Sequence, residues 1–144
     1  MDYLIEQGIK VDAIITDPPY AVTSYSWDQI IPFDQMWDKL SKLIKDDGAI
    51  VLFGNEPFSS SLRMSNPKFY RYDWKWIKTQ VTGFQNAKYQ PLRCYEDIMI
   101  FSKCGAVASA KPPMRYFPQG IIPVNLKVTT KPINYLGDKK SDEK

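Results

Sequence analysis

Four consecutive residues, Asp17, Pro18, Pro19 and Tyr20, combine groups that could bind a planar ligand carrying an amine. Proline lacks a backbone N–H and biases the residue before it toward an extended conformation, so this corner is stiff and its carbonyls stay free as acceptors. The two N–H bonds of an exocyclic amino group on a nucleobase could be accepted by the Asp17 carboxylate and the Pro18 carbonyl. Tyr20 could then stack on the ring. The simpler alternative is a rigid turn in which Asp17 only caps a neighbouring segment.

A second set of side chains is suited to contact a nucleic acid. Trp27 follows the corner closely and could line the mouth of a binding site. The polar segment 81–94 and the run before it carry basic and amide side chains, namely Lys78, Gln85, Asn86, Lys88 and Arg93. Such residues either contact phosphates and bases or form an ordinary solvated face, and we weigh the two interpretations equally. Trp37, Trp74 and Trp76 lie in periodic segments and are expected in the core or on a sheet face.

The composition excludes several kinds of chemistry. The 144 residues include no histidine, so serine-type triads and ordinary histidine acid–base catalysis are ruled out. Cys94 and Cys104 are too few for a zinc site, and we expect reduced thiols and no metal. No apolar run has the length of a membrane span and no secretory signal opens the chain, which predicts a cytoplasmic protein without membrane contact. The net charge of +3 permits a nucleic-acid partner without requiring one.

The elements that must position the corner are indicated by the spacing of apolar residues. A short helix is expected over residues 2–7, and the β-branched run 11–16 predicts a buried strand that ends just before the corner. Helical spacing over 33–47 predicts a helix capped by Asp34, and the apolar run 49–54 predicts a second strand. A strand, helix, strand succession implies a parallel pair joined by a right-handed crossover.

The rest of the chain completes an α/β prediction. A further helix is expected to begin near residue 55, and the runs 72–80 and 96–103 predict two strands, as a hairpin or near neighbours. We therefore expect one α/β region over 1–103. Residues 104–144 are rich in proline and lysine without periodicity, which predicts an irregular arm or the start of another region, partly disordered.

Two residues of the second strand are expected beside the corner. Ligands of open α/β sheets bind at the carboxyl ends of the parallel strands. Asp17 follows the first strand, and Phe53 and Gly54 end the second. Phe53 and Gly54 are therefore candidates for lining the same pocket, although Phe53 would also suit the core.

The quoted corner, "DPPY" after an apolar strand, resembles the catalytic motif of the DNA methyltransferases that modify the amino groups of adenine N6 or cytosine N4. The segments "SWDQIIPFDQMWDKLSKLIKDDGAIVLFGNEPF" and "YDWKWIKTQVTGFQNAKYQPLRCYEDIMIFSK" extend this resemblance over residues 10–103, to the adenine-specific branch of phages and prophages and of restriction–modification systems. It implies a partial Rossmann-like methyltransferase sheet, double-stranded DNA as partner, and transfer of a methyl group from S-adenosylmethionine to a flipped adenine. It also implies that Asp17 lies near the methionine end of the cofactor.

One feature of that family is missing. Its members hold the cofactor with a glycine-rich F-x-G-x-G loop, but the seven glycines of this chain never form G-x-G. The run "TTKPINYLG" resembles only the approach to the downstream portion that carries this loop. We therefore expect the catalytic half of a methyltransferase, with weak cofactor binding and with little or no activity alone. An exposed apolar sheet edge is expected to lead to self-association or to pairing with the missing C-terminal half.

Two other functions stay open from the sequence. A catalytically degenerate methyltransferase-like module could bind DNA or a protein without methyl transfer. In that case DNA binding would persist and Asp17→Ala would change little. An RNA or protein amino-group methyltransferase could carry a closely similar four-residue corner, although the flanking segments favour the DNA enzymes.

Overall fold

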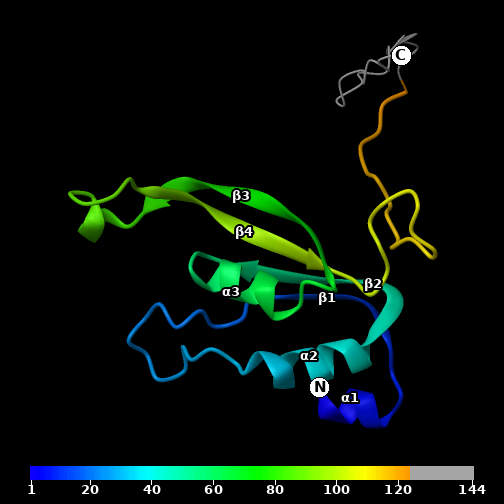
Figure 1. Cartoon of the computed structure of the whole chain (residues 1–144). Helices are drawn as coiled ribbons and strands as arrows, with labels where there is room; N and C mark the ends of the chain where they lie inside the picture. The colour runs from blue at the N-terminus through cyan, green and yellow to red at the C-terminus, as the bar shows by residue number, and fades with distance from the viewer. Residues whose placement is uncertain (124–144) are drawn as a thin grey trace, which may run out of the picture.

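The computed structural model describes residues 1–123, and these residues form a four-stranded mixed sheet with two helices packed on one face (Figure 1). The strand order is β1-β2-β4-β3. The elements, in chain order, are α1 (Asp2–Glu6), β1 (Val11–Thr16), α2 (Phe33–Leu43), β2 (Ile44–Gly54), α3 (Phe58–Ser65), β3 (Tyr70–Thr82), a 3-10 turn (Phe84–Asn86) and β4 (Arg93–Phe101).

The strand pairing confirms the α/β prediction. Strands β1 and β2 are parallel and are connected through α2, as the strand, helix, strand succession implied. Strands β3 and β4 form an antiparallel hairpin, and β4 inserts between β3 and β2. Both pairs that involve β4 are antiparallel, so the sheet is mixed rather than uniformly parallel.

The core lies between this sheet and the two helices. Trp37 and Leu40 of α2 and Leu62 of α3 pack on Ile50 of β2 and Phe101 of β4, and all five side chains are buried. The Trp37 ring lies 4.8 Å from the Phe101 ring between centroids, and its Nε1–H donates to Ser65 Oγ at 2.8 Å. Burying a side chain of this size contributes about 1.5 to 3 kcal/mol, so this layer accounts for much of the stability of the fold.

The helix expected over 33–47 is shorter than predicted. Helix α2 ends at Leu43, and Ile44 already has extended backbone and pairs with Val11 in the parallel ladder. Ile44 is buried from its position in the strand, so tertiary pairing outweighs the helical spacing that had placed it in the helix. Asp34 makes no capping hydrogen bond, because α2 begins at Phe33 with Pro32 as its N-cap residue.

The prediction that the first strand is buried is wrong. Strand β1 is the edge of the described sheet, and only Val11 and Ile14 reach the core. Ile15 points to the other face and is 68% exposed. The strand is apolar on both faces, but within residues 1–123 only one face is covered.

The sheet face opposite the helices, here called the open face, carries large aromatic side chains. Trp74 and Trp76 of β3 lie there and are about half exposed, which agrees with a sheet-face position and not with the core. Trp37 is the core tryptophan of the three.

The segment that follows β4 contains no helix or strand as far as residue 123. Its backbone folds back through a bridge between Gly105 and Pro113. Arg115 then donates to Asp47 Oδ2 at 2.5 Å and lies 3.5 Å from Asp12, which holds the segment at the amino-terminal ends of the parallel strands. The division of the chain at residue 104 stays a prediction, and the run "TTKPINYLG" lies outside the described residues.

Candidate functional site

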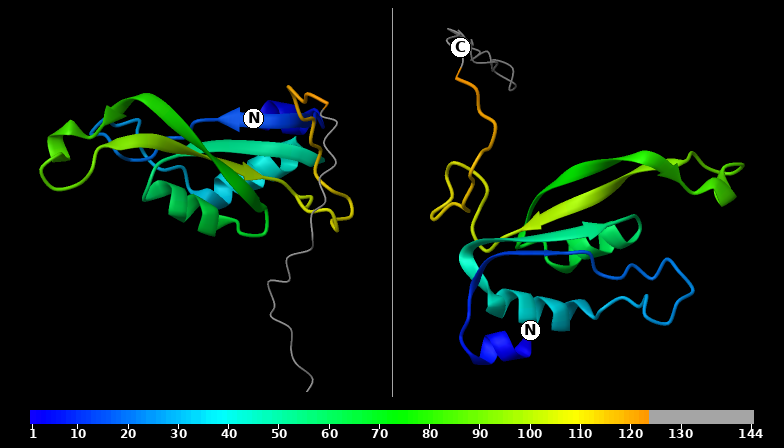
Figure 2. Two further views of the ribbon diagram at one scale, coloured as in Figure 1. Left: turned by 90° about the horizontal axis from the view of Figure 1, so that it is seen from above. Right: turned by 180° about the vertical axis from the view of Figure 1, so that it is seen from behind.

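Asp17 lies where the topology predicted, at the carboxyl edge of the parallel strands. Thr16 pairs with Leu52, so the chain leaves β1 next to Phe53 and Gly54 at the end of β2. Asp17 is exposed at this edge and Pro18 beneath it is buried. The loop that follows, and the far end of the β3–β4 hairpin, extend beyond the same edge of the sheet (Figure 2).

Asp17 borders two separate hollows. The first, here called the corner hollow, has a volume of about 370 Å³ and is formed within the loop after β1. Its lining residues are Asp17, Pro18, Pro19, Tyr20, Val22, Thr23, Trp27 and Asp28. The corner hollow therefore brings Trp27 together with all four residues of the DPPY corner.

The second hollow, here called the face hollow, lies on the open face and has a volume of about 440 Å³. It is lined by Asp17, Phe53, Ile98 and Trp76, one residue from each strand or strand end. Phe53 pairs with Ile98 in the sheet, and the rings of Phe53 and Trp76 meet edge to face with centroids 6.1 Å apart. Three apolar side chains and one carboxylate thus surround this space. Trp76 and Ile98 were not foreseen as site residues, since the pairing of Ile98 with Phe53 and the ring contact of Trp76 with Phe53 depend on β4 inserting next to β2.

Tyr20 does more in the structure than present an aromatic face. Its ring stacks on Phe58 with centroids 5.1 Å apart, and its hydroxyl donates to Asp17 Oδ1. Burial, then this hydrogen bond to Asp17, raises the pKa of the Tyr20 hydroxyl well above its ordinary range. The hydroxyl is therefore a neutral donor at any physiological pH, and it leaves the other oxygen of Asp17 as the available acceptor.

Asp28 is the residue of this loop that the sequence did not single out. Its side chain is 5% exposed, and its two carboxylate oxygens accept hydrogen bonds from the backbone N–H groups of Ala21, Val22 and Thr23 at 2.8, 2.9 and 2.7 Å. The Thr23 hydroxyl donates to the same carboxylate at 2.8 Å. These hydrogen bonds, led by that from Thr23, lower the pKa of Asp28 from its ordinary value. Asp28 is thus an ionised group held inside the loop.

A cluster of charged side chains connects the β3–β4 hairpin to α3 next to the end of β2. Arg63 of α3 lies 2.9 Å from Glu56, 3.3 Å from Asp73 and 2.9 Å from Asp97, which pairs with Gly54 across the sheet. Lys75 also contacts the Asp97 carboxylate. Burial opposes ionisation of Asp97, but its bonds to Lys75 and Arg63 prevail and lower its pKa from the ordinary value. The cluster holds the end of β2 in a fixed place relative to the hairpin.

The side chains expected to contact a nucleic acid are divided by the structure. Asn86 and Arg93 come together around a hollow of about 210 Å³ near the far end of the hairpin. Gln85 and Lys88 are exposed on that same end but do not line the hollow. Lys78 is bound to Glu96 and lies over the Trp76 ring, so its charge is partly neutralised. The hairpin end therefore offers more accessible polar groups than the strand does.

Gly54 has a structural reason to be glycine. A Cβ at this position would lie 2.6 Å from Met99 Cε and 2.9 Å from Ser59 Oγ, on the side of the sheet that faces the helices. The missing side chain therefore allows α3 to pack closely on β2. A contact of Gly54 with a cofactor would have to involve its backbone.

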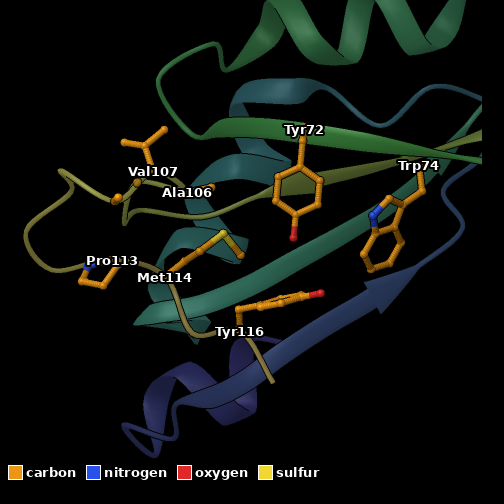
Figure 3. A pocket seen from close by; sticks show the side chains of 9 residues that line it. Tyr72, Trp74, Ala106, Val107, Pro113, Met114 and Tyr116 are labelled. Atoms are coloured by element: carbon orange, nitrogen blue, oxygen red, sulfur yellow. The ribbon is translucent and has the colours of Figure 1, made fainter. Parts of the chain in front are cut away.

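A further hollow of about 490 Å³ lies between β3 and the segment after β4 (Figure 3). Tyr72 and Trp74 of β3 face Met114 and Tyr116 of that segment across it. Its lining residues include no carboxylate and no basic side chain, and Asp17 is not among them. We therefore place the candidate site at the two hollows that share Asp17.

Neither a metal centre nor a membrane segment is found in residues 1–123. No group of three or more histidine, cysteine, aspartate or glutamate side chains there is arranged to hold a metal ion. None of the helices in that part of the chain has the length and apolar character needed to cross a membrane.

The arrangement of strands and helices is that of known solved structures. Two crystal structures of M1.HpyAVI, one of them the SAM complex, match this chain with a TM-score of 0.52 and 21% sequence identity. The match covers 71% of this chain and 50% of the M1.HpyAVI chain, so the present chain spans about half the length of that protein. The fold is therefore that of part of a methyltransferase-like domain. No family model matches the sequence, and no curated protein matches it.

Proposed function

We propose that this chain is the catalytic region of a DNA methyltransferase that acts on adenine N6. The observation that carries the proposal is the position of Asp17, whose carboxylate borders both the corner hollow and the face hollow. Methyl transfer to an amine needs two ligands side by side with an acceptor between them. The similarity of the fold to M1.HpyAVI, solved with SAM, supports the same proposal.

The corner hollow is the proposed place of the target base. It is lined by the rings of Tyr20 and Trp27 and by the Asp17 carboxylate, which together suit a flat ring with an exocyclic amine. Stacking on an aromatic side chain contributes about 1 to 3 kcal/mol per base, which offsets much of the cost of taking the base out of the duplex. Within residues 1–123, only Tyr20 donates to the Asp17 carboxylate, so one oxygen is available to the amine.

The role of the corner is to make a poor nucleophile reactive. The lone pair of the adenine amine is conjugated with the ring, and acceptors on its hydrogens favour tetrahedral geometry and stabilise the positive charge that develops on nitrogen. Asp17 and the Pro18 carbonyl are the proposed acceptors. Asp17 also receives the proton that the nitrogen loses once the new bond has formed.

The face hollow is the proposed place for the reactive end of S-adenosylmethionine. Phe53, Ile98 and Trp76 give it apolar walls, and Asp17 supplies a negative charge that attracts a cationic ligand. Bound S-adenosylmethionine would supply the methyl group, with the C–S bond breaking and its electrons going to sulfur as the amine lone pair forms the N–C bond. The residues present fit this end of the cofactor, and the backbone of Gly54 lies beside them. We propose that this chain alone binds the cofactor weakly.

Double-stranded DNA is the proposed partner. The β3–β4 hairpin extends beyond the carboxyl edge of the parallel strands (Figure 1). Gln85, Asn86 and Lys88, at the far end of the hairpin, are exposed. The major groove of B-DNA admits a two-stranded ribbon of this kind, where amides can read base edges and lysines can contact phosphates. The flipped base and the groove contact would then lie at the same edge of the sheet.

The test is to identify the methylated nucleoside. The full chain is incubated with a pool of duplex DNA and S-adenosylmethionine carrying a labelled methyl group, and the DNA is then digested to nucleosides. Because the chain alone is proposed to bind the cofactor weakly, S-adenosylmethionine is supplied at a saturating concentration, and we expect slow formation of labelled N6-methyladenine with the wild type. Asp17→Ala should reduce this formation at least about 100-fold, the size of effect typical of removing one hydrogen-bonding group that stabilises a transition state. Asp34→Ala, which changes an exposed aspartate of α2, serves as the matched control.

Two results would contradict the proposal. If the wild type binds DNA but forms no labelled nucleoside, and if Asp17→Ala binds DNA as tightly as the wild type does, the chain is a non-catalytic binding module. Label that appears only in RNA or in protein supplied in parallel would indicate a different class of amino-group methyltransferase.

A further inference from the structure

We propose that Asp28 is the positioning residue that holds the DPPY corner in its base-binding conformation. This inference rests on the proposed function, because it concerns the residues that would grip the base. Asp28 is one of the residues that line the corner hollow, and both oxygens of its carboxylate bind the backbone of the loop.

The carboxylate binds three successive backbone N–H groups directly after the corner. Its Oδ1 accepts from Ala21, and its Oδ2 accepts from Val22 and from both the backbone and the hydroxyl of Thr23. Ala21 is joined to Tyr20, so the first of these bonds fixes the backbone where the corner ends. Hydrogen bonds to an ionised group are shorter and stronger than neutral ones, which suits a carboxylate that organises a loop.

The backbone at Ala21 needs such a partner. Ala21 has a φ of 57°, in the left-handed region that residues with a Cβ rarely adopt. Left-handed residues outside glycine persist only where surrounding contacts hold them. The bond from Ala21 N–H to Asp28 at 2.8 Å is the contact that holds this one.

Asp28 is also the centre of the hydrogen bonding in its loop. Among the described residues 1–123, every hydrogen bond made by residues 21–31 has Asp28 as one partner, including that from Asp28 N–H to the Tyr25 carbonyl at 3.1 Å. No helix or strand lies in this range. The direction of the chain away from Tyr20 therefore depends on one side chain, and the shape of the corner hollow depends on that direction.

The test compares Asp28→Asn with Asp34→Asn in the full chain. Asparagine keeps the shape of the side chain but replaces one acceptor oxygen by a donor group, which cannot accept from the loop amides. Asp34 is an exposed aspartate six residues further on and serves as the matched control. Thr23→Ser and Thr23→Val form a second pair, since only serine keeps the hydroxyl that donates to Asp28.

Two measurements are made on each variant. The first is amide hydrogen exchange of residues 21–23 relative to that of β2. The second is the ratio of dissociation constants for two duplexes that carry, opposite one abasic site, either adenine or unsubstituted purine, which lacks the amine. With Asp28→Asn we expect exchange at 21–23 to rise at least tenfold while β2 is unchanged, and the preference for adenine to fall at least fivefold. Asp34→Asn should match the wild type, and Thr23→Val should raise the exchange of residues 21–23 more than Thr23→Ser does.

The inference requires both results with Asp28→Asn, the faster exchange of residues 21–23 and the reduced preference for adenine. If Asp28→Asn leaves the exchange of residues 21–23 at the wild-type level, or if the exchange rises while the preference for adenine is retained, the inference is overturned. A wild type that does not distinguish adenine from purine would contradict the proposed function instead. In that case the exchange measurement still decides whether Asp28 orders the loop.

Discussion

At the scale of single residues, the site depends on how Asp17 and Tyr20 divide their tasks. Tyr20 both packs on Phe58 and donates its hydroxyl to Asp17, so ring and hydroxyl have separate effects. The hydroxyl occupies one acceptor oxygen in the free protein. The ring borders the corner hollow, where the base is proposed to lie.

The two tasks of Tyr20 can be separated by substitution. We expect Tyr20→Ala to weaken binding of the adenine duplex by about 10-fold or more, because a stacking contact of about 1 to 3 kcal/mol is lost. Tyr20→Phe keeps the ring and should leave the dissociation constant within about threefold of the wild-type value. A Tyr20→Phe variant that binds as poorly as Tyr20→Ala would show that the hydroxyl, and not stacking, is what matters.

Two tryptophans provide a second comparison of residues. Trp37 is 8% exposed, and Trp37→Ala should lower the free energy of unfolding by about 3 to 5 kcal/mol, the usual cost of emptying such a site. Trp27 is 68% exposed in the corner hollow, and Trp27→Ala should change stability by less than about 0.5 kcal/mol while weakening DNA binding. Urea titration measures the first effect and a binding titration the second. Equal losses of stability in Trp37→Ala and Trp27→Ala would contradict a buried Trp37 and an exposed Trp27.

At the scale of elements, the order and type of helices and strands follow from the sequence better than their ends and faces do. The spacing of apolar residues is enough to predict β1, α2, β2 and the β3–β4 hairpin. It places Ile44 in the helix, because the pairing of Ile44 with Val11 is a contact between segments far apart in the chain. For the same reason, an apolar strand such as β1 gives no sign that one of its faces is exposed.

The candidate site shows the same division between local and distant information. The DPPY corner is local, and its position at the end of β1 follows from the α/β topology. Asp28 could not be assigned in this way, because a lone aspartate in a polar loop has many possible partners until the path of the loop is known. Trp76 reaches the face hollow only because β4 lies between β3 and β2.

The contact between α3 and the hairpin can be tested at this scale. The Arg63 side chain is 22% exposed and binds three carboxylates, so Arg63→Ala should cost about 3 kcal/mol in unfolding free energy, the lower end for a broken buried pair because Lys75 remains on Asp97. Arg115, whose side chain is 54% exposed and pairs with Asp47, provides the control. Arg115→Ala should lower the free energy of unfolding by less than about 1 kcal/mol. If chemical denaturation gives equal losses of stability for the Arg63 and Arg115 variants, the contact of α3 with the hairpin does not stabilise the fold more than an exposed ion pair does.

At the scale of the whole molecule, the charge cluster predicts how stability depends on pH. The pKa of Asp97 and that of Asp73 are both lowered from the ordinary value of 3.8, because burial is outweighed by bonds to Lys75 and, for Asp97, to Arg63. A carboxyl whose pKa is lower in the folded state stabilises the fold above the unfolded value, and this contribution is lost as pH falls. Unfolding free energy should therefore decrease below about pH 4, and Arg63→Ala should flatten the decrease. If unfolding free energy falls as steeply with decreasing pH in Arg63→Ala as in the wild type, the pH dependence does not come from this charge cluster.

The open face and the free edge of β1 predict association of copies of this chain. Ile15, Trp74 and Trp76 are exposed on that face, and within residues 1–123 β1 has a strand on one side only. Unpaired edges with apolar side chains favour contact with another chain. Light scattering should show an apparent mass that rises with concentration, and Ile15→Lys should reduce it. A concentration-independent monomer would contradict this prediction.

The central claim is that Asp17 and its corner bind the exocyclic amine of an adenine, and one binding experiment tests it most directly. Dissociation constants are measured for the adenine and purine duplexes described above, with the wild type and with Asp17→Ala. Because a hydrogen bond to a charged group is worth about 1.5 to 3 kcal/mol, the wild type should prefer adenine by at least about 10-fold, and Asp17→Ala should remove that preference. Equal binding of adenine and purine by the wild type, or a preference that survives in Asp17→Ala, would contradict the claim.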